Sequence, residues 1–330
     1  MKIITLEEHF LDTDVARASA AASKALSPNF AASYDPARGF PYSPSGDVLR
    51  DLGENRLADM DANQISMQVL SCLSVQQLPA EVALDLTKKV NDTLAATVAN
   101  HPDRFAAFTA LPTAVPNDAA DELARGVTEL GFVGTMIFGR TEDEFLDAER
   151  FDPILARAAD LKVPIYLHPA VSPRVVSDAN YACLDPLVSA RFETSAWGWH
   201  QETAVHFLHL VLSGTLDRYP ELQFILGHWG EMIPFYLDRL DEALPRTVTK
   251  LGRSIGEYVR QNVYITPSGM WSQAQLQFCA QTVGTDRMMY SVDYPFVGNE
   301  GAAEFLETAD LPQPVKEDIA HGAAERLLGL

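Results

Sequence analysis

Short apolar runs alternate with longer amphipathic stretches along almost the whole chain. The short runs are rich in β-branched and other apolar residues, which predicts strands. Eight such runs occur, at residues 2–6, 66–72, 105–111, 132–138, 163–168, 223–228, 262–266 and 287–293. The longer stretches have helical periodicity, and several are closed by Gly or Pro, which predicts helices at 82–101, 119–131, 151–162, 202–220, 234–244 and 273–284.

Strands that alternate with helices predict a parallel sheet, and eight of them predict an α/β fold of the closed (β/α)8 or TIM-barrel type. An open doubly wound sheet is the alternative, but no G-x-G-x-x-G follows any predicted strand. No linker-like tract divides the chain, so residues 1–330 are expected to form one domain. Two long excursions, at about 11–55 and 170–200, follow the first and fifth strands and should lie at the catalytic end of the barrel.

Charge restricts the partners of this protein. The 330 residues carry a formal net charge of −20, with 47% hydrophobic and 21% charged residues. A field of this sign repels phosphate, so nucleic acid and anionic membranes are excluded as partners. An anionic substrate would need local cations or a metal ion to bind here.

The cysteines and the hydropathy pattern point to the cytoplasm. The three cysteines are far apart and odd in number, which fits reduced thiols and not a disulfide framework. No apolar run reaches 18 residues, and the N-terminus lacks a basic segment followed by a long apolar one. The expected protein is therefore neither secreted nor membrane-spanning.

Ionisable residues recur at the C-terminal ends of the predicted strands. Glu7 and His9 follow the first strand, and the fifth, sixth and eighth strands end at His168, His228 and Asp293. Strand ends converge in a barrel, so these residues should share one pocket. Glu7 and His9 are two apart and point to the same side of an extended chain.

Two imidazoles and two carboxylates, from Glu7, His9, His168 and Asp293, form a ligand set that suits Zn²⁺ or Mn²⁺. The run 132–139 has no Lys that could be carboxylated to bridge two metals, so one ion per chain is expected. Taken singly, His168 could be a hydrogen-bonded rim residue and Asp293 a turn cap. The prediction of a metal site rests on the convergence of all four residues. Glu8 points away from them and is expected to be structural.

The stretch LGHWGEMIPFYLDRLD is the second dense cluster. Glu231 lies three residues after His228, so its carboxylate could orient the ring and raise its pKa. The alternative is a Glu231 that caps a helix. Arg239 lies two helical turns further on, where it could reach a substrate or pair at the surface with Asp238 or Asp241.

Other candidates have structural interpretations. His206 and His209 are three apart on a predicted helix and could bind metal, although an outward or core-facing helical stripe explains them better. His200 lies beside Trp197 and Trp199 in a long loop. These aromatic rings could stack on a flat ligand or simply pack the loop against the protein.

Together these segments resemble the decarboxylase branch of the amidohydrolase superfamily, which contains γ-resorcylate, 2,3-dihydroxybenzoate and 5-carboxyvanillate decarboxylases. The matching segments cover nearly the whole chain, in the order LEEHF, RLADMD, VND, HPDRF, ELGFVG, YLHPAVSP, ETAVH, YPELQFILGHWGE and SVDYPF. The resemblance implies a metal-dependent distorted barrel that is a homodimer or homotetramer. The first motif has Glu-x-His where hydrolases of the superfamily have His-x-His, which favours decarboxylation.

The resemblance also implies roles for individual residues. Glu7, His9, His168 and Asp293 would bind the metal, His228 and Glu231 would form a polar network with Asp293, and Arg239 would contact substrate. Phe138 stands where close relatives carry an Asn facing the substrate ring, and Trp199 is a further candidate for substrate contact. HPAVSP after the fifth strand is closer to the carboxyvanillate type than to HPRNP of the γ-resorcylate type.

The sequence therefore predicts a carboxy-lyase that decarboxylates an ortho-hydroxybenzoate reversibly and without oxidation. Asp293, with a raised pKa, would protonate the ring carbon that carries the carboxylate, and His228 and Glu231 would tune that proton. A metal-dependent hydrolase or hydratase acting on a small cyclic or aromatic carboxylate is the alternative. A barrel that only binds a ligand is a third possibility.

Overall fold

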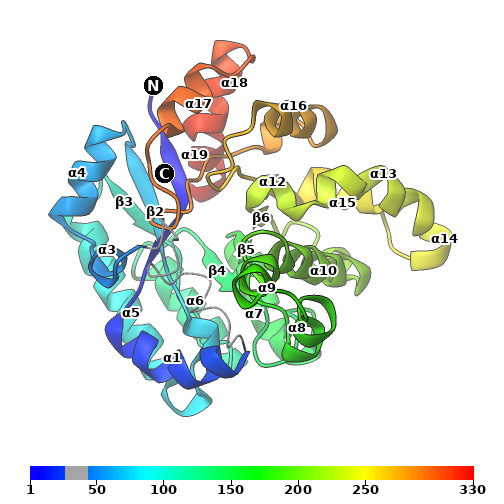
Figure 1. Cartoon of the computed structure of the whole chain (residues 1–330), viewed down its shortest axis with the longest axis horizontal. Coiled ribbons are helices and arrows are strands. Elements are labelled where there is room, and N and C mark those ends of the chain that lie inside the picture. Colours follow the sequence, from blue (N-terminus) through cyan, green and yellow to red (C-terminus); the bar gives the residue numbers. More distant parts are fainter. Residues whose placement is uncertain (27–43) are drawn as a thin grey trace.

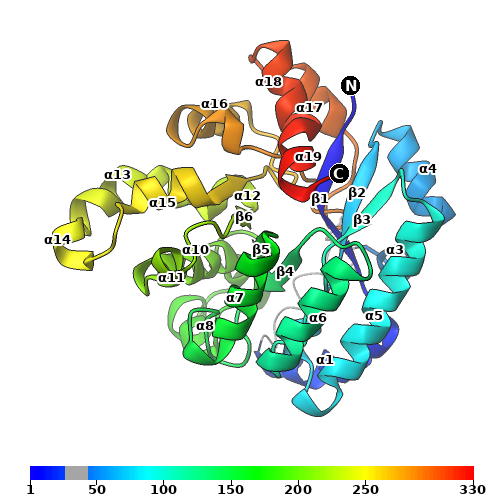
Figure 2. The same cartoon turned by 180° about the vertical axis from the view of Figure 1, so that it is seen from behind.

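The computed structural model describes residues 1–26 and 44–330. Figure 1 shows strands at the centre of the molecule and helices around them, and Figure 2 shows the same arrangement from behind. All strand pairs in the two sheets are parallel. The strands are β1 (Ile4–Phe10), β2 (Met67–Cys72), β3 (Phe105–Ala107), β4 (Thr135–Phe138), β5 (Ile165–His168), β6 (Phe224–Leu226) and β7 (Val263–Ile265).

Isolated bridges join the two sheets into a ring. One sheet has the order β1-β2-β3 and the other β4-β5-β6-β7. A parallel bridge between Thr109 and Thr135 connects the end of β3 to β4. On the other side, the segment after β7 makes parallel bridges to Ile265 through Met288 and to Glu8 through Tyr294. The hydrogen-bonded order therefore closes on itself, as a barrel of the α/β class requires.

The eighth predicted strand, 287–293, is not a regular strand in this structure. Its residues make single bridges to their neighbours instead of a continuous ladder. The Glu8 carboxylate accepts hydrogen bonds from the backbone N–H groups of Val292 (3.1 Å) and Tyr294 (3.2 Å). The Glu8 side chain thus binds backbone N–H groups that would otherwise pair with a neighbouring strand. This explains why residues 287–293 do not form a regular strand.

Helices cover the outside of the barrel, and most lie within a few residues of the predicted ranges. The predicted helix 202–220 is an exception because it breaks at Gly214, which has a φ of 77°. The helices are α1 (Thr13–Leu26), α3 (Gly46–Arg50), α4 (Glu54–Ala62), α5 (Ala80–Asn100), α6 (Pro116–Thr128), α7 (Asp152–Leu161), α8 (Arg174–Asn180), α9 (Pro186–Glu193), α10 (Gly198–Leu212), α11 (Thr215–Arg218), α12 (His228–Glu231), α13 (Ile233–Ala243), α14 (Arg246–Thr249), α15 (Ile255–Asn262), α16 (Gln273–Thr282), α17 (Ala302–Glu307), α18 (Gln313–Glu317) and α19 (Ala323–Leu328). Short 3₁₀ turns lie at Val75–Gln77, Glu149–Phe151 and Thr285–Arg287, and a π-helical turn at Asp318–Gly322.

The two predicted excursions contain helices. The described part of the first holds α1 and α3, and its residues 27–43 lie outside the described chain. The second holds α8 and α9 and runs into the first turn of α10. Three helices further along, α13, α14 and α15, extend sideways beyond the rest of the molecule in Figure 1 and Figure 2.

β1 is longer than predicted, and its irregular register places the first functional side chains. The strand runs to Phe10 because His9 and Phe10 still pair with Ser71 and Cys72 of β2. The register shifts between Thr5 and Glu8. Bulges of this kind interrupt the regular alternation of side chains and re-aim them near active sites.

An apolar cluster fills the barrel beneath the site. It includes Leu6 of β1, Met136 of β4 and Ile225 of β6, all at most 2% exposed. Ala324 of α19 belongs to the same cluster, and Lys2 contacts Glu325 at 2.6 Å, so α19 packs beside the start of β1. The opposite end, where the strands finish, carries the polar side chains of the candidate site.

Candidate metal centre and active site

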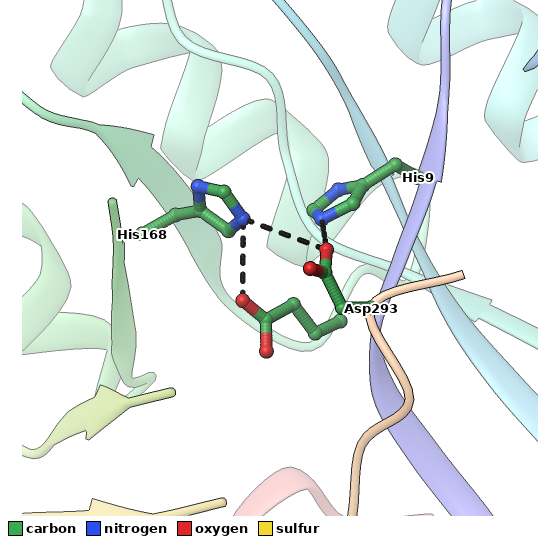
Figure 3. Close-up of side chains that lie close together, drawn as sticks. His9, His168 and Asp293 are labelled. Carbon is green, nitrogen blue, oxygen red and sulfur yellow. Dashed lines mark hydrogen bonds and ion pairs between the residues drawn. The ribbon is translucent and has the colours of Figure 1, made fainter. Parts of the chain in front are cut away.

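Four side chains with metal-binding groups meet where the strands end. Glu7 and His9 come from β1, His168 ends β5, and Asp293 lies in the segment after β7. Each offers one oxygen or ring nitrogen, and these atoms all lie within 4.8 Å of one another. Figure 3 shows the rings of His9 and His168 turned toward the Asp293 carboxylate. The structure therefore brings together the four residues that the strand ends predicted.

Hydrogen bonds on the far sides of the rings orient the two histidines. His168 Nδ1 lies 2.7 Å from the carbonyl oxygen of Pro169, and His9 Nδ1 lies 2.8 Å from Ser71 Oγ. A carbonyl can only accept, so Nδ1 of His168 carries a hydrogen, and its Nε2 is the atom that faces the cluster. His9 Nε2 likewise faces Asp293 Oδ1 at 3.1 Å. Both Nε2 atoms are therefore available as ligands.

The surroundings of Glu7 test whether a metal ion fits. Its Oε2 accepts hydrogen bonds from the hydroxyls of Tyr166 (2.6 Å), Ser268 and Ser291 (3.3 Å). Its Oε1 is buried without a hydrogen-bond partner, as is Nε2 of His168, and these two atoms lie 3.2 Å apart. A cation held between these two atoms would satisfy both of them. The cluster therefore fits a divalent ion held by mixed N and O ligands.

Interactions within the cluster shift the pKa values of Asp293 and His168 from their usual values. Burial opposes ionisation of Asp293, but the neighbouring imidazoles of His168, His228 and His9 outweigh it and hold the pKa of Asp293 well below its usual range. Burial also disfavours a cationic His168, yet Asp293 and Glu7 raise the pKa of His168 to about 9. The prediction of a raised pKa for Asp293 is therefore wrong, because three imidazoles surround its carboxylate.

Glu8 has a structural role, as its position in the sequence suggested. Its side chain is fully buried, and burial raises its pKa to about 7. The Glu8 carboxylate accepts hydrogen bonds from the backbone N–H groups of the residues on either side of Asp293. Asp293 itself has a φ of 70°. A non-glycine residue in this left-handed region is strained. Glu8 therefore holds the strained backbone that presents Asp293 to the cluster.

A left-handed turn after β6 orients the side chains of His228 and Glu231. His228, Trp229 and Glu231 have φ values of 49°, 58° and 52°, and Gly230 lies between them at 80°. Strain of this kind clusters at functional sites. The turn directs His228 Nδ1 to Glu231 Oε1 at 2.8 Å and His228 Nε2 toward Asp293 Oδ2 at 3.7 Å.

His228 and Glu231 form a buried, hydrogen-bonded ion pair. Burial disfavours a charged His228, but the Glu231 and Glu7 carboxylates raise its pKa well above the usual value. Glu231 is fully buried and also lies 2.8 Å from His200 Nδ1. The expected pairing of His228 with Glu231 is therefore present, and His200 extends it.

A cavity of about 810 Å³ opens above the cluster. His168, His228 and Asp293 lie at its wall together with many apolar side chains. Phe138 ends β4 with its ring centroid 4.5 Å from that of His168, and Trp199 lines the cavity from α10. Phe138 and Trp199 therefore occupy positions from which they could contact a flat substrate.

Arg239 does not reach this cavity. It lies on the outer side of α13, its side chain is 69% exposed, and it pairs with Glu242 at 3.0 Å. The prediction that Arg239 contacts substrate is wrong for the cavity of its own chain. Helical periodicity places Arg239 one turn beyond the exposed Phe235, on a face turned to solvent.

Three further residues belong to the site without having been predicted there: Tyr166, Ser268 and His200. The hydroxyl donors to Glu7 are not ionisable strand-end residues, and the position of Ser268 after the seventh predicted strand is the one signal for them in the sequence. His200 stood out only through the neighbouring tryptophans. His206, one of the alternative metal candidates, is buried and accepts a hydrogen bond from the Leu146 N–H at 2.8 Å, which is a structural role.

Comparison with known proteins agrees with this geometry. The family model described as Amidohydrolase matches residues 40–330. The chain belongs to the amidohydrolase family. This amidohydrolase is 37% identical to the decarboxylase orsB of Emericella nidulans over 290 residues, covering 86% of this chain and 87% of that one. It is 35% identical to a γ-resorcylate decarboxylase of Rhodococcus jostii, covering 86% and 89% of the two chains.

Solved structures give the same family. The crystal structure of 5-carboxyvanillate decarboxylase from Novosphingobium aromaticivorans, in complex with manganese and 4-hydroxy-3-methoxy-5-nitrobenzoic acid, superposes with a TM-score of 0.90. Its sequence is 31% identical, and the alignment covers 100% of this amidohydrolase and 96% of that chain. The resemblance inferred from the motifs is therefore confirmed. No helix in residues 1–26 and 44–330 is long and apolar enough to span a bilayer.

Proposed function

We propose that this amidohydrolase is a metal-dependent, non-oxidative decarboxylase, a carboxy-lyase that acts on an ortho-hydroxybenzoate. The observation that carries the proposal is the convergence of two imidazoles and two carboxylates at the wall of a largely apolar cavity. The decarboxylase relatives, one of them solved with manganese and a hydroxybenzoate, support the same reaction type. We propose Mn²⁺ as the ion, with Zn²⁺ as the other ion that suits these ligands.

Glu7, His9, His168 and Asp293 would hold the ion. When bound, the ion would supply positive charge that attracts the carboxylate and ortho oxygen of the substrate and offsets the net charge of −20. Phe138 and Trp199 would keep the aromatic ring in place and exclude water. Holding the ring in one orientation lowers the entropic part of the barrier.

The reaction needs one proton for each carboxylate that is lost. His228 holds this proton, because Glu231 and Glu7 stabilise its cationic form. His228 Nε2 lies 3.7 Å from Asp293 Oδ2, so Asp293 can relay the proton to the substrate. The low pKa of Asp293 keeps the proton on His228 at rest, and Asp293 would carry it only transiently during the transfer. The proton adds to the ring carbon that bears the carboxylate, the carbon–carbon bond breaks, its electron pair restores the aromatic ring, and CO₂ leaves.

A substrate panel tests the proposal. Metal-loaded protein should release CO₂ from at least one ortho-hydroxybenzoate and should not hydrolyse esters or lactones. Asp293→Asn removes the proton carrier and one ligand charge, so kcat should fall by more than about 10²-fold, the lower end of what general acid catalysis contributes. Hydrolysis products without CO₂ would instead support the hydrolase alternative.

We also propose that the protein is a single-domain, cytoplasmic homo-oligomer. Three aromatic side chains on α13 and α16, here called the aromatic patch, support self-association: Phe235 (73% exposed), Tyr236 (52%) and Phe278 (40%). Phe235 packs against both of the others, with ring centroids 5.4 and 5.9 Å apart. Exposed aromatic groups of this kind favour a protein interface, and a two-fold axis would pair the patch with itself.

The free cysteines Cys72, Cys183 and Cys279 support a reducing compartment.

A further inference from the structure

His200 connects the long excursion after β5 to the polar network of the cavity. It lies in the first turn of α10, and its side chain is 14% exposed and lines the cavity. Its Nδ1 lies 2.8 Å from Oε2 of Glu231, 31 residues further along the chain. Nothing in the motif pattern assigns a role to this position.

The His200 ring has hydrogen-bond partners on both sides. The Glu231 carboxylate oxygen accepts, so His200 Nδ1 carries a hydrogen and donates it. On the other side of the ring, Nε2 lies 3.0 Å from the indole Nε1 of Trp199 and 3.1 Å from the carbonyl oxygen of Ser195. Nε2 can accept from the indole N–H or donate to the carbonyl, but not both at once, and either partner holds this side of the ring. Both ring nitrogens are therefore held, and the ring orientation is fixed.

Glu231 in turn transmits this orientation to His228. Its two oxygens accept from different rings, Oε1 from His228 and Oε2 from His200, each at 2.8 Å. The carboxylate is fully buried, so loss of one donor leaves an oxygen without compensation and allows the group to rotate. Rotation would weaken the hydrogen bond that directs His228 Nε2 toward Asp293.

We propose that His200 is a positioning residue for the decarboxylation, and that it acts by fixing the Glu231 carboxylate that orients His228. This inference rests on the proposed function, because it assigns His200 to the proton-delivering side of that site. The same three side chains could also be considered as ligands for a second ion. Distances of 2.8 Å from each Nδ1 to its own carboxylate oxygen are those of charge-assisted hydrogen bonds, which favours the positioning role.

Two substitutions of His200 and one matched control test the proposal in the metal-loaded protein. His200→Ala should lower kcat by about 10- to 100-fold, as loss of an orienting partner does elsewhere, with KM and ion content unchanged. His200→Asn places an amide N–H where Nδ1 lies, so kcat should stay within about threefold of wild type. The control is His209→Ala on the same helix, since His209 is half exposed and lies 3.4 Å from Asp147; its kcat should not change.

Imidazole NMR separates this inference from the proposed function. In ¹⁵N-labelled protein, the His228 Nδ1–H signal should shift and exchange faster with water in His200→Ala but not in His200→Asn. An unchanged signal in His200→Ala, or equal loss of kcat in the Ala and Asn variants, would overturn the positioning role. Two ions per chain in wild type and one in His200→Ala would also overturn it, in favour of a second metal site. Wild-type protein that releases no CO₂ from any hydroxybenzoate overturns the proposed function alone, because the NMR comparison still stands.

Discussion

His168 and Glu7 present a ring nitrogen and a carboxylate oxygen to each other at 3.2 Å, and neither atom has a hydrogen-bond partner. We expect wild-type protein to hold about one divalent ion per chain. His168→Ala removes one of four ligands and should weaken Mn²⁺ binding by more than about 100-fold, because loss of a direct ligand costs more than loss of an orienting group. Elemental analysis after dialysis against a defined Mn²⁺ concentration measures this.

His209→Ala is the matched control for the metal prediction, since His209 lies outside the cluster. This variant should retain the ion. Full occupancy in His168→Ala would show that the ion is held elsewhere. The chemistry of the individual side chains thus predicts a single metal centre, and elemental analysis can reject it without any activity assay.

The end of β6 approaches β1 so closely that it has no room for a side chain. A Cβ added at Gly227 would lie 2.6 Å from Ser268 Oγ and 3.0 Å from both carboxylate oxygens of Glu7. Gly227→Ala should therefore displace Glu7, lower the metal affinity and reduce the free energy of unfolding by about 1–3 kcal/mol, as overpacking does. Thermal unfolding with and without Mn²⁺ measures both effects.

A second Gly→Ala variant shows whether these effects are local. At Gly53, the nearest atom to an added Cβ is Asp51 Oδ1 at 3.5 Å, an ordinary contact. Gly53→Ala should leave the gain in melting temperature on Mn²⁺ addition unchanged. If Gly227→Ala also keeps the wild-type gain, the close approach of β6 to Glu7 is not important for the site.

Helix α10 carries a histidine that should make stability depend on pH. Burial lowers the pKa of His206 to about 3, and its Nε2 accepts from the Leu146 N–H, so the ring stays neutral in the folded protein. The unfolded chain binds this proton below a pKa of 6.5, whereas the folded one does not until about 3. The contribution of His206 is therefore present above pH 6.5 and is lost as the pH falls toward 3.

His206→Gln isolates this effect, because its amide oxygen can accept from the same N–H but does not titrate. Between pH 7.5 and pH 5, wild type should lose about 2 kcal/mol more unfolding free energy than the variant. Urea titrations at the two pH values measure the difference. Parallel pH profiles for the two proteins would mean that His206 is not held neutral.

The aromatic patch is exposed and belongs to α13 and α16. Figure 1 shows that these helices project from the barrel. If two chains associate through this patch, Phe235→Asp should convert the oligomer into monomers, because it places charge at the centre of an apolar contact. Light scattering coupled to size-exclusion chromatography measures the mass. Val248→Asp is the control, since Val248 lies on α14 and is 61% exposed. An unchanged mass in Phe235→Asp would exclude the patch as the interface.

The alternation of strands and helices, and the meeting of candidate metal ligands at strand ends, could be predicted from the sequence alone. The spacing of Glu7 and His9 and the positions of His168 and Asp293 follow from local periodicity, which is encoded by neighbouring residues. Parallel strands of a closed sheet then bring their ends together whatever lies between them. For this reason the fold class and the ligand cluster were both predictable.

Other properties were decided only by the tertiary structure, because they depend on contacts between residues remote in sequence. Arg239 lies at the surface because α13 turns that face to solvent, and the packing of α13 against the barrel decides which face this is. Asp293 has a lowered pKa because imidazoles from three other elements surround it. His200 reaches Glu231 only because the excursion after β5 folds back over the barrel. Exposure, protonation and hydrogen-bond partners are properties of the assembled site, so no pattern along the chain determines them.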